Sequence, residues 1–466
     1  MLFTSGWFFL FLGITFAGYY LAWRWQLCWL ILASLVFYAW QNPWLLILLL
    51  AAAAADVIVS RRIIVSPHPR AWAIAGVSFN VGLLAFFKYN HLLDASFPSL
   101  AASAGDPLKL LLALPLPIGI SFYTLHGISL LLDTLSDGTA RRDVASARGF
   151  GQHAANTVLY VSFFPQLIAG PITKAHQFYP QIGAKKFAAI DWDGAAAALV
   201  IGYFLKSVVA DNLAQQTFWL AYPHFLSFSS IDLIQLLLGY GMQIFADFAG
   251  YSLIAIGLAK LFGYNLPENF RFPYISESFS EFWTRWHISL SSWMREYLYF
   301  PLGGNRKGRL RTYLNLMAVM CIAGLWHGAA ISYAVWGAWH GAALTIERML
   351  GGTQASRALV LRVLRGMLVF AVVTAGWLLF KLPHFSDVQA YAGALLSNRA
   401  GVSHRQIDVV IAGLALPVIA WHAHYLIARR RGTLFAGWRK PVALGLMLAA
   451  IVVNARSSQP FIYFQF

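Results

Sequence analysis

Long runs of apolar residues, separated by short polar stretches, dominate the chain. They lie at about residues 2–23, 26–41, 44–60, 71–87, 110–132, 154–172, 194–221, 231–264, 312–346, 364–383, 407–428 and 441–455. Most approach the ~20 residues that an α-helix needs to cross a bilayer, so the pattern predicts an all-α polytopic membrane protein with about 11–13 spanning or re-entrant helices. In this topology the 312–346 run makes two passes and the 154–172 run turns back.

The composition agrees with this fold class. Of the 466 residues, 59% are hydrophobic and only 11% are charged, and the mean hydropathy is +0.62. A soluble globular domain carries about 25% charged residues, so lipid must cover much of this surface. An ordinary soluble enzyme is therefore excluded. The two cysteines, Cys28 and Cys321, both lie in apolar runs, which argues against a disulfide framework or a Cys-based metal site.

The basic residues, which outnumber the acidic ones, cluster in particular loops. The first of them, Arg24, follows an apolar stretch, which is the reverse of a signal peptide and predicts an uncleaved first span with its N-terminus outside. Alternating the sides from there brings most Lys and Arg residues to one face of the membrane. Because cytoplasmic loops are enriched in Lys and Arg, four loops are predicted to face the cytoplasm: 61–70, 137–149, 266–311 and 429–440.

Residues 279–300 differ from the predicted spans. In FSEFWTRWHISLSSWMREYLYF, aromatic and aliphatic residues recur at three- and four-residue steps, and charged residues recur on another face. This periodicity predicts one amphipathic helix at the cytoplasmic interface. Its aromatic face must bury against the spans, which would bring His287 towards the membrane interior, near His327. The basic loop that follows, PLGGNRKGR, suits lipid headgroups or a phosphate, although an ordinary cytoplasmic loop is the simpler interpretation.

Two histidines, His327 and His340, lie in the run 312–346, which contains no Asp, Glu, Lys or Arg. A buried imidazole in such surroundings stays neutral and can accept a proton from a hydroxyl group. Helix packing is the alternative interpretation for either histidine. Gly324 and Gly328 leave room beside His327 for a substrate or a close helix, whereas an adjacent tryptophan favours packing for His340.

One acidic residue, Asp247, lies inside an apolar run, where a charge needs a partner. Lys206 or Arg285 is the expected structural partner, and a brace for a catalytic pocket is the functional alternative. No HExxH motif or close histidine pair at ligand spacing occurs near these residues, so no metal site is predicted. His422 and His424, two residues apart near the end of a late span, are interpreted as packing residues, with a place at the membrane interface or adventitious metal binding as the alternatives.

Seven motifs follow one another along almost the whole chain. They are FYAWQNPWLL (37–46), LPIGISFYTLHGISLLLD (116–133), FFPQLIAGPI (163–172), QIFADFAGYS (243–252), NFRFPYISESFSEFWTRWHISLSSWMREYLYFPLGGNRKG (269–308), LWHGAAISYAVWGAWHGA (325–342) and FIYFQF (461–466). Together they resemble the membrane-bound O-acyltransferase (MBOAT) family, in the bacterial branch similar to alginate O-acetyltransferases. The WHISLS and LWHGA pair is the most specific part. His126 departs from the family's pattern, which tends to have Phe-Gln at 125–126, and is assigned no role.

The resemblance implies a single membrane-embedded acyltransferase domain over 1–466, built as a helical bundle around a central tunnel, with its catalytic region at about 243–348. It implies that His327 is the principal catalytic histidine and His287 the second. Acyl transfer to a hydroxyl group needs such a base, together with donors that stabilise the developing oxyanion. Polar neighbours that could orient the thioester, stabilise charge or brace the substrate site are Trp326, Asn315, Ser291 and Asp247.

The resemblance also implies the substrates. The acyl donor would be a cytoplasmic thioester used as a co-substrate, with no permanently bound cofactor. It would be acetyl-CoA or an acyl carrier protein, as in the teichoic acid D-alanyltransferases, and the acetyl group is favoured. The acceptor would be an exported polysaccharide, as in alginate biosynthesis, or a periplasmic acetyltransferase partner. The protein would then be a multi-pass protein of the bacterial inner membrane, with no nucleic-acid partner.

Two other classes of function remain alternatives. A transporter usually has repeated halves and helices broken at corresponding positions, and no such halves are visible in the sequence. A non-enzymatic subunit of a polysaccharide assembly would tolerate replacement of His287 and His327. No Gly-x-Ser-x-Gly elbow occurs, so direct transfer is favoured over a covalent acyl-enzyme.

Overall fold

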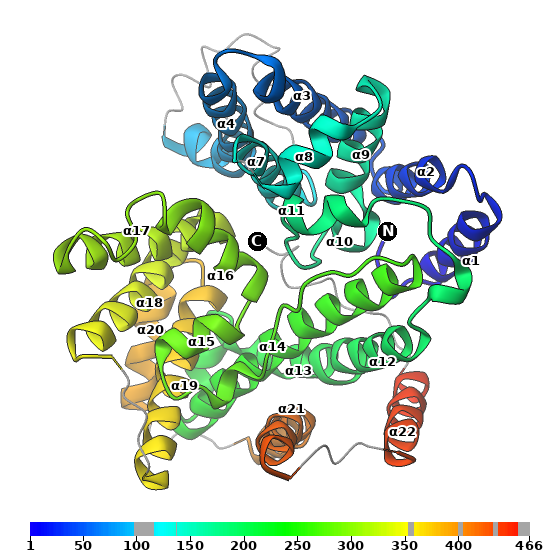
Figure 1. Cartoon of the computed structure of the whole chain (residues 1–466). Helices are drawn as coiled ribbons and strands as arrows, with labels where there is room; N and C mark the ends of the chain where they lie inside the picture. Colours follow the sequence, from blue (N-terminus) through cyan, green and yellow to red (C-terminus); the bar gives the residue numbers. More distant parts are fainter. Residues whose placement is uncertain (97–115, 137, 353–357, 399–403, 432–436, 455–466) are drawn as a thin grey trace. The chain divides into compact units, whose positions relative to one another are not determined.

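A computed structural model describes residues 1–96, 116–136, 138–352, 358–398, 404–431 and 437–454 (Figure 1). Throughout these ranges the regular secondary structure is helical, without strands. The predicted all-α membrane fold is confirmed. Five helical stretches in the described part of the chain are long and apolar enough to cross a membrane: 69–90, 192–220, 230–261, 359–381 and 405–428. The FIYFQF motif and the start of the 110–132 run lie outside the described residues.

The chain separates into two compact units. The first contains 1–196 and 254–267, and the second contains 197–253 and 268–466. The chain passes between them at three places: within α12 (Trp192–Tyr203), within α14 (Ser230–Leu261) and between residues 267 and 268, after α14.

In the first unit, nearly every predicted apolar run is a helix. The helices are α1 (Gly6–Leu21), α2 (Gln26–Ala39), α3 (Leu45–Val65), α4 (Pro69–Ser96), α7 (Ile120–Leu135), α8 (Thr139–Ser146), α9 (Phe150–Ser162), α10 (Phe164–Leu167) and α11 (Ala175–Phe178). Helices α3, α4 and α7 pack together around the buried side chains of Ile63, Ala73 and Leu131. The 154–172 run is broken into α9 and α10, as expected for a run that does not cross in one pass.

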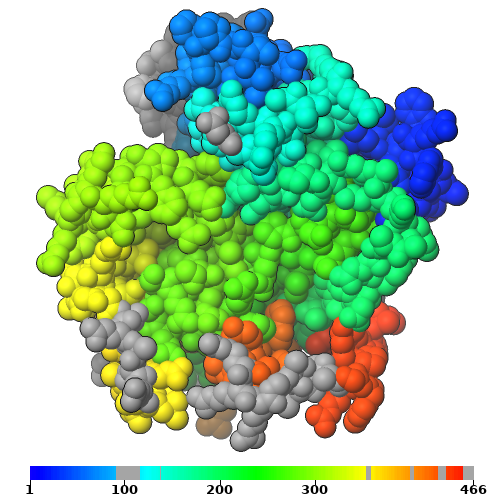
Figure 2. All heavy atoms as spheres, in the orientation of Figure 1, coloured from blue at the N-terminus to red at the C-terminus, as the bar shows by residue number. Residues whose placement is uncertain are grey.

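The second unit holds all of the predicted site residues. Its helices are α13 (Asp211–Thr217), α15 (Phe279–Arg285), α16 (Ile288–Met294), α17 (Arg309–His327), α18 (Ile331–Met349), α19 (Leu359–Lys381), α20 (Phe385–Ser397), α21 (Arg405–Arg431) and α22 (Arg439–Val453). In the space-filling view its green and yellow-green residues form a closely packed face (Figure 2). The helix α20 was not predicted from the sequence.

The apolar residues on the outer faces of this unit are exposed, as a lipid-facing surface requires. Val360, Val363 and Met367 on α19 are all more than half exposed, and α22 has no buried residue. Lipid can cover such side chains, and water cannot do so without a large cost in free energy.

The 312–346 run forms two packed helices, α17 and α18, so the predicted division of this run into two segments is observed. That each segment crosses the membrane stays a prediction. Glycines allow their backbones to touch. A Cβ added to Gly324 would lie 2.2 Å from the carbonyl oxygen of Tyr333, and one added to Gly337 would lie 2.3 Å from that of Met320. Small residues permit this close approach in membrane helices. The sequence left open whether Gly324 makes room for a substrate or for a neighbouring helix, and the structure places helix α18 there.

Candidate active site

His287 lies at a break between two short helices. Its backbone is left-handed, with φ 43° and ψ 53°, a conformation that non-glycine residues seldom adopt. The prediction of one continuous amphipathic helix over 279–300 is therefore wrong. The amide of Ile288 does not continue the helical pattern of α15 but donates 2.9 Å to the carbonyl oxygen of Asn269. The predicted burial of the aromatic face is observed at Trp286 and Trp293.

Helix α15 is held at its N-terminus by carboxylates. Glu347, near the end of α18, accepts hydrogen bonds from the amides of Phe279 and Ser280, at 2.6 and 3.1 Å. The hydroxyl of Ser278 caps the amide of Glu281 at 3.0 Å. Carboxylates at a helix N-terminus satisfy amides that have no partner within the helix and interact favourably with its dipole.

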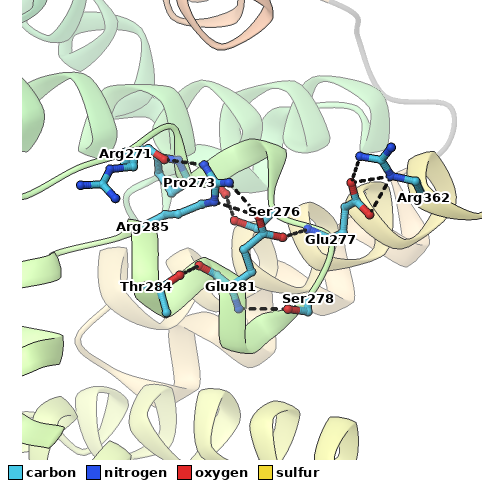
Figure 3. A network of polar contacts seen from close by, with 9 residues as sticks. All are labelled: Arg271, Pro273, Ser276, Glu277, Ser278, Glu281, Thr284, Arg285 and Arg362. Atoms are coloured by element: carbon cyan, nitrogen blue, oxygen red, sulfur yellow. Dashed lines mark hydrogen bonds and ion pairs between the residues drawn. The ribbon is translucent and has the colours of Figure 1, made fainter. Parts of the chain in front are cut away.

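Ion pairs extend this anchor to α19 and to the chain before α15 (Figure 3). Arg362 of α19 makes a two-pronged contact with Glu277, with nitrogen–oxygen distances of 2.6 and 2.9 Å. Arg285 contacts Glu281 at 2.8 Å, and its guanidinium donates to the carbonyl oxygen of Arg271 at 3.0 Å. These contacts fix the helix that leads into His287.

The rings of His287 and His327 lie close together. Their centroids are 6.4 Å apart, and the two residues are only 1% and 7% exposed. The predicted convergence of the two histidines is confirmed. Phe248 of α14 packs edge-on against His287 with a centroid distance of 4.6 Å. Trp326, also predicted as a site residue, contacts both imidazoles, at 6.0 Å from His287 and 4.9 Å from His327.

Burial determines the protonation of His287. It lowers the pKa of this imidazole well below its ordinary value, so the ring is neutral and carries one N–H donor and one acceptor nitrogen. Among the described residues, its Nε2 atom has no hydrogen-bond partner. Its hydrogen-bonding capacity is therefore unused within the described part of the chain.

Aromatic side chains surround His327. Trp336 of α18 and Phe380 of α19 each lie 5.2 Å from its ring, both in edge-to-face geometry. Beyond Trp336 lies His340, 4.8 Å away, which is fully buried and also contacts Trp283 at 5.2 Å. These contacts agree with the packing interpretation of His340. Because these rings leave His327 only 7% exposed, polar interactions at its imidazole are stronger than they would be in water.

The other predicted site residues lie in different places. Ser291 supports the turn, since its amide donates to the carbonyl oxygen of His287 at 2.9 Å and its hydroxyl to that of Trp286 at 3.2 Å. Asn315 holds the basic loop, donating to the carbonyl oxygen of Gly304 at 3.0 Å.

His422 packs against Phe245 and Tyr274 and bonds to a backbone carbonyl within its own helix, in agreement with a packing role. Asn269, Phe248 and Glu347 were not predicted.

The expected partner of Asp247 is present. Lys206, in a π-helical segment between α12 and α13, contacts Asp247 and Asp211, each with a nitrogen–oxygen distance of 2.7 Å. All three side chains are largely buried. Arg285, the other candidate, pairs with Glu281 instead. Because Asp247 adjoins Phe248 in α14, the network fixes this helix at the point where Phe248 contacts His287.

Replacing Lys206 with methionine is expected to destabilise the protein by about 3–5 kcal/mol, because it leaves two buried carboxylates without their cation. Thermal unfolding of the detergent-solubilised protein would measure this loss. The matched variant Lys206→Met/Asp247→Asn removes one of the two charges and should recover part of the stability. An unchanged unfolding temperature in Lys206→Met would contradict the buried charge network.

Comparison with known proteins identifies the chain. A family model described as "MBOAT, membrane-bound O-acyltransferase family" matches residues 72–382, which include both site histidines. The chain belongs to the MBOAT family. It is therefore a multi-pass membrane enzyme that transfers an acyl group from an acyl donor.

Individual relatives of this MBOAT protein agree with the assignment. It is 34% identical to the probable alginate O-acetylase AlgI of Pseudomonas putida, with both chains covered completely. It is 33% identical to a peptidoglycan O-acetyltransferase of Helicobacter pylori over 85% of this chain and 80% of that one. A teichoic acid D-alanyltransferase of Bacillus subtilis is 29% identical over 47% of this chain and 55% of its own length.

Proposed function

We propose that this MBOAT protein moves an acetyl group from a cytoplasmic thioester across the bacterial inner membrane. The acceptor is a hydroxyl group of an exported polysaccharide or of a periplasmic acetyltransferase partner. The observation that carries the proposal is the meeting of His287 and His327, with 6.4 Å between ring centroids, in buried surroundings. Relatives named as acetylating enzymes of alginate and peptidoglycan support the acetyl group and a polymeric acceptor.

In this mechanism His327 is the general base. It takes the proton of the acceptor hydroxyl as the oxygen attacks the thioester carbonyl carbon. The new ester C–O bond forms, the C–S bond breaks, and the departing thiolate receives the proton from His327. The transfer is direct, so no acyl-enzyme forms.

His287 acts on the carbonyl oxygen. Its Nε2 atom, buried and without a partner among the described residues, can donate a hydrogen bond as negative charge develops there. Because the imidazole is neutral, this donor needs no prior protonation. Trp326, which contacts both histidine rings, orients the substrate. Asp247 and Ser291 act indirectly, through α14 and through the backbone of His287.

The basic loop 301–309 is proposed to bind the phosphates of the donor. It carries several exposed Lys and Arg residues, and Asn315 holds its backbone at Gly304. Phosphate groups need cations or N–H donors. Acetyl-CoA is the favoured donor, because the teichoic acid D-alanyltransferases match only about half of the chain, whereas acetylating relatives match most of it.

Transfer across a sealed membrane tests this function. Proteoliposomes containing uronic acid oligosaccharides are supplied from outside with acetyl-CoA labelled in the acetyl group. Molecules with the basic loop outside are expected to deliver label to the enclosed sugar, in amounts well above a His327→Ala preparation. Label found only on sugar added outside would contradict transfer across the membrane.

A parallel assay tests the donor and the enzymatic role. If the enclosed sugar is labelled only when an acyl carrier protein carries the label, the donor is that protein and not acetyl-CoA. Undiminished transfer in variants lacking both site histidines would instead support a non-enzymatic assembly subunit. The protein can insert in either orientation, so the fraction of molecules with the basic loop outside is measured by cleavage of that loop with protease added outside. Transfer is then expressed per molecule of that fraction.

A further inference from the structure

Asn269 makes a dense set of hydrogen bonds around the active-site turn. The residue is only 1% exposed. Its backbone oxygen accepts from the amide of Ile288 at 2.9 Å. Its side-chain oxygen accepts from Ser289 twice, from the amide at 3.3 Å and from the hydroxyl at 2.9 Å. Its side-chain nitrogen donates to the hydroxyl of Ser252 at 3.0 Å.

These bonds hold the residues that immediately follow His287. A left-handed backbone is unfavourable for an L-residue with a side chain, so it persists where the surroundings fix it. Ile288 and Ser289 provide the first amides of α16, which have no partners within that helix. Asn269 accepts from both of them. It therefore fixes the start of α16 and, with it, the direction in which His287 leaves the backbone.

A second backbone bond supports the same turn from the other side. The amide of Arg271 donates to the carbonyl oxygen of Arg285 at 2.9 Å. The segment 269–271 thus binds the chain both before and after Trp286 and His287. A shift of Trp286 or His287 along the chain direction would break the Arg271–Arg285 bond or the Asn269–Ile288 bond.

Helix α14 connects this brace to the imidazole ring. Ser252, the partner of the Asn269 amide, lies one helical turn from Phe248, which packs on the ring of His287 at 4.6 Å. One face of α14 therefore contacts the His287 ring directly, through Phe248. The same face holds the backbone after His287 indirectly, because Ser252 bonds to Asn269. An amide side chain suits this place, because it accepts and donates at once.

We propose that Asn269 is a positioning residue for the acyl-transfer reaction, which acts by holding His287 in its left-handed conformation opposite His327. This inference rests on the proposed role of His287. Asn269 itself touches no reacting atom. Its removal should displace the imidazole by a fraction of its width, and displacements on the order of 1 Å can cost about 10²-fold in rate.

The test compares Asn269→Ala in two backgrounds. In the otherwise unchanged enzyme, kcat for acetyl transfer from acetyl-CoA is expected to fall by about 10- to 100-fold, with KM for acetyl-CoA altered by less than about 2-fold. In a His287→Ala background, the same substitution should cause no further loss, since the ring that it positions is already absent. Asn398→Ala, which removes bonds to two backbone carbonyls far along the chain, is the matched control and should retain full activity.

Hydrogen exchange provides a readout that does not depend on turnover. In Asn269→Ala, amides in a peptide covering 286–292 should exchange faster, while those of α20 stay unchanged. If Asn269→Ala does not fold, Ser289→Ala removes one donor to Asn269 and should give a smaller change in the same direction.

The outcomes separate the two proposals. A further loss from Asn269→Ala in the His287→Ala background, or unchanged exchange at 286–292, would overturn the positioning role. Full activity of His287→Ala would instead overturn the proposed role of His287, whatever the exchange data for Asn269 are.

Discussion

Replacing His327 with alanine is expected to lower the rate of acyl transfer by about 10³-fold or more, while the protein still inserts and folds. The proposed base is then missing, and no other imidazole in the described part of the chain takes its place: His287 lies 6.4 Å away between centroids, and His340 packs against the ring of Trp336. General bases contribute roughly 10²–10⁴-fold. Acetyl groups on the acceptor, counted per mole of purified protein, are the measurement.

A buried histidine outside the site provides the control. His422 is packed between Phe245 and Tyr274, so His422→Phe should preserve most of the activity. Equal expression and equal unfolding temperatures would show that the His327→Ala protein is intact. Appreciable turnover in such a protein would remove His327 from the role of base.

The sequence predicted that both histidines are buried and lie close together, and the structure shows both features. The run around His327 contains no charged residue, and the aromatic periodicity around His287 required burial. Both side chains are buried, and they meet. The helical runs were equally predictable, because the length and hydropathy of a membrane span depend on contiguous residues.

The break at His287 could not be predicted in this way. Trp286 and Trp293 keep a helical spacing across it, so the apolar pattern contains no signal of an interruption. The interruption depends on a hydrogen bond between Ile288 and Asn269, which are distant in sequence. Only the tertiary fold brings this acceptor to the amide.

Asn315 illustrates a related limit. Its polarity within an apolar run indicates a buried hydrogen-bonding role but not the partner, and the partner is the basic loop. For Asp247 the need for a cation was clear from burial, yet two cations were candidates. The choice of Lys206 depends on the packing of its π-helical segment against α14, where a Cβ added to Gly250 would lie 2.9 Å from the backbone nitrogen of Lys206.

The double variant His287→Ala/His327→Ala is expected to be scarcely less active than His327→Ala alone. If His327 removes the proton and His287 stabilises the oxyanion in the same transition state, little catalysis remains for His287 once the base is lost. Losses at residues that act as a unit are strongly non-additive. The acyl-transfer rates of the wild type, both single variants and the double variant form the cycle that measures this coupling.

The fold of the His287 variant needs its own check, because its backbone is left-handed. Asparagine adopts this conformation more readily than alanine, so His287→Asn preserves the turn while removing the imidazole. The two replacements should lose similar activity if the ring is what matters, and a much larger loss in the alanine variant would indicate a disturbed turn. Additive losses in the cycle, in proteins that remain folded, would mean that the two histidines serve separate steps. Such a result is hard to reconcile with rings 6.4 Å apart, because a single substrate carbonyl could lie between them.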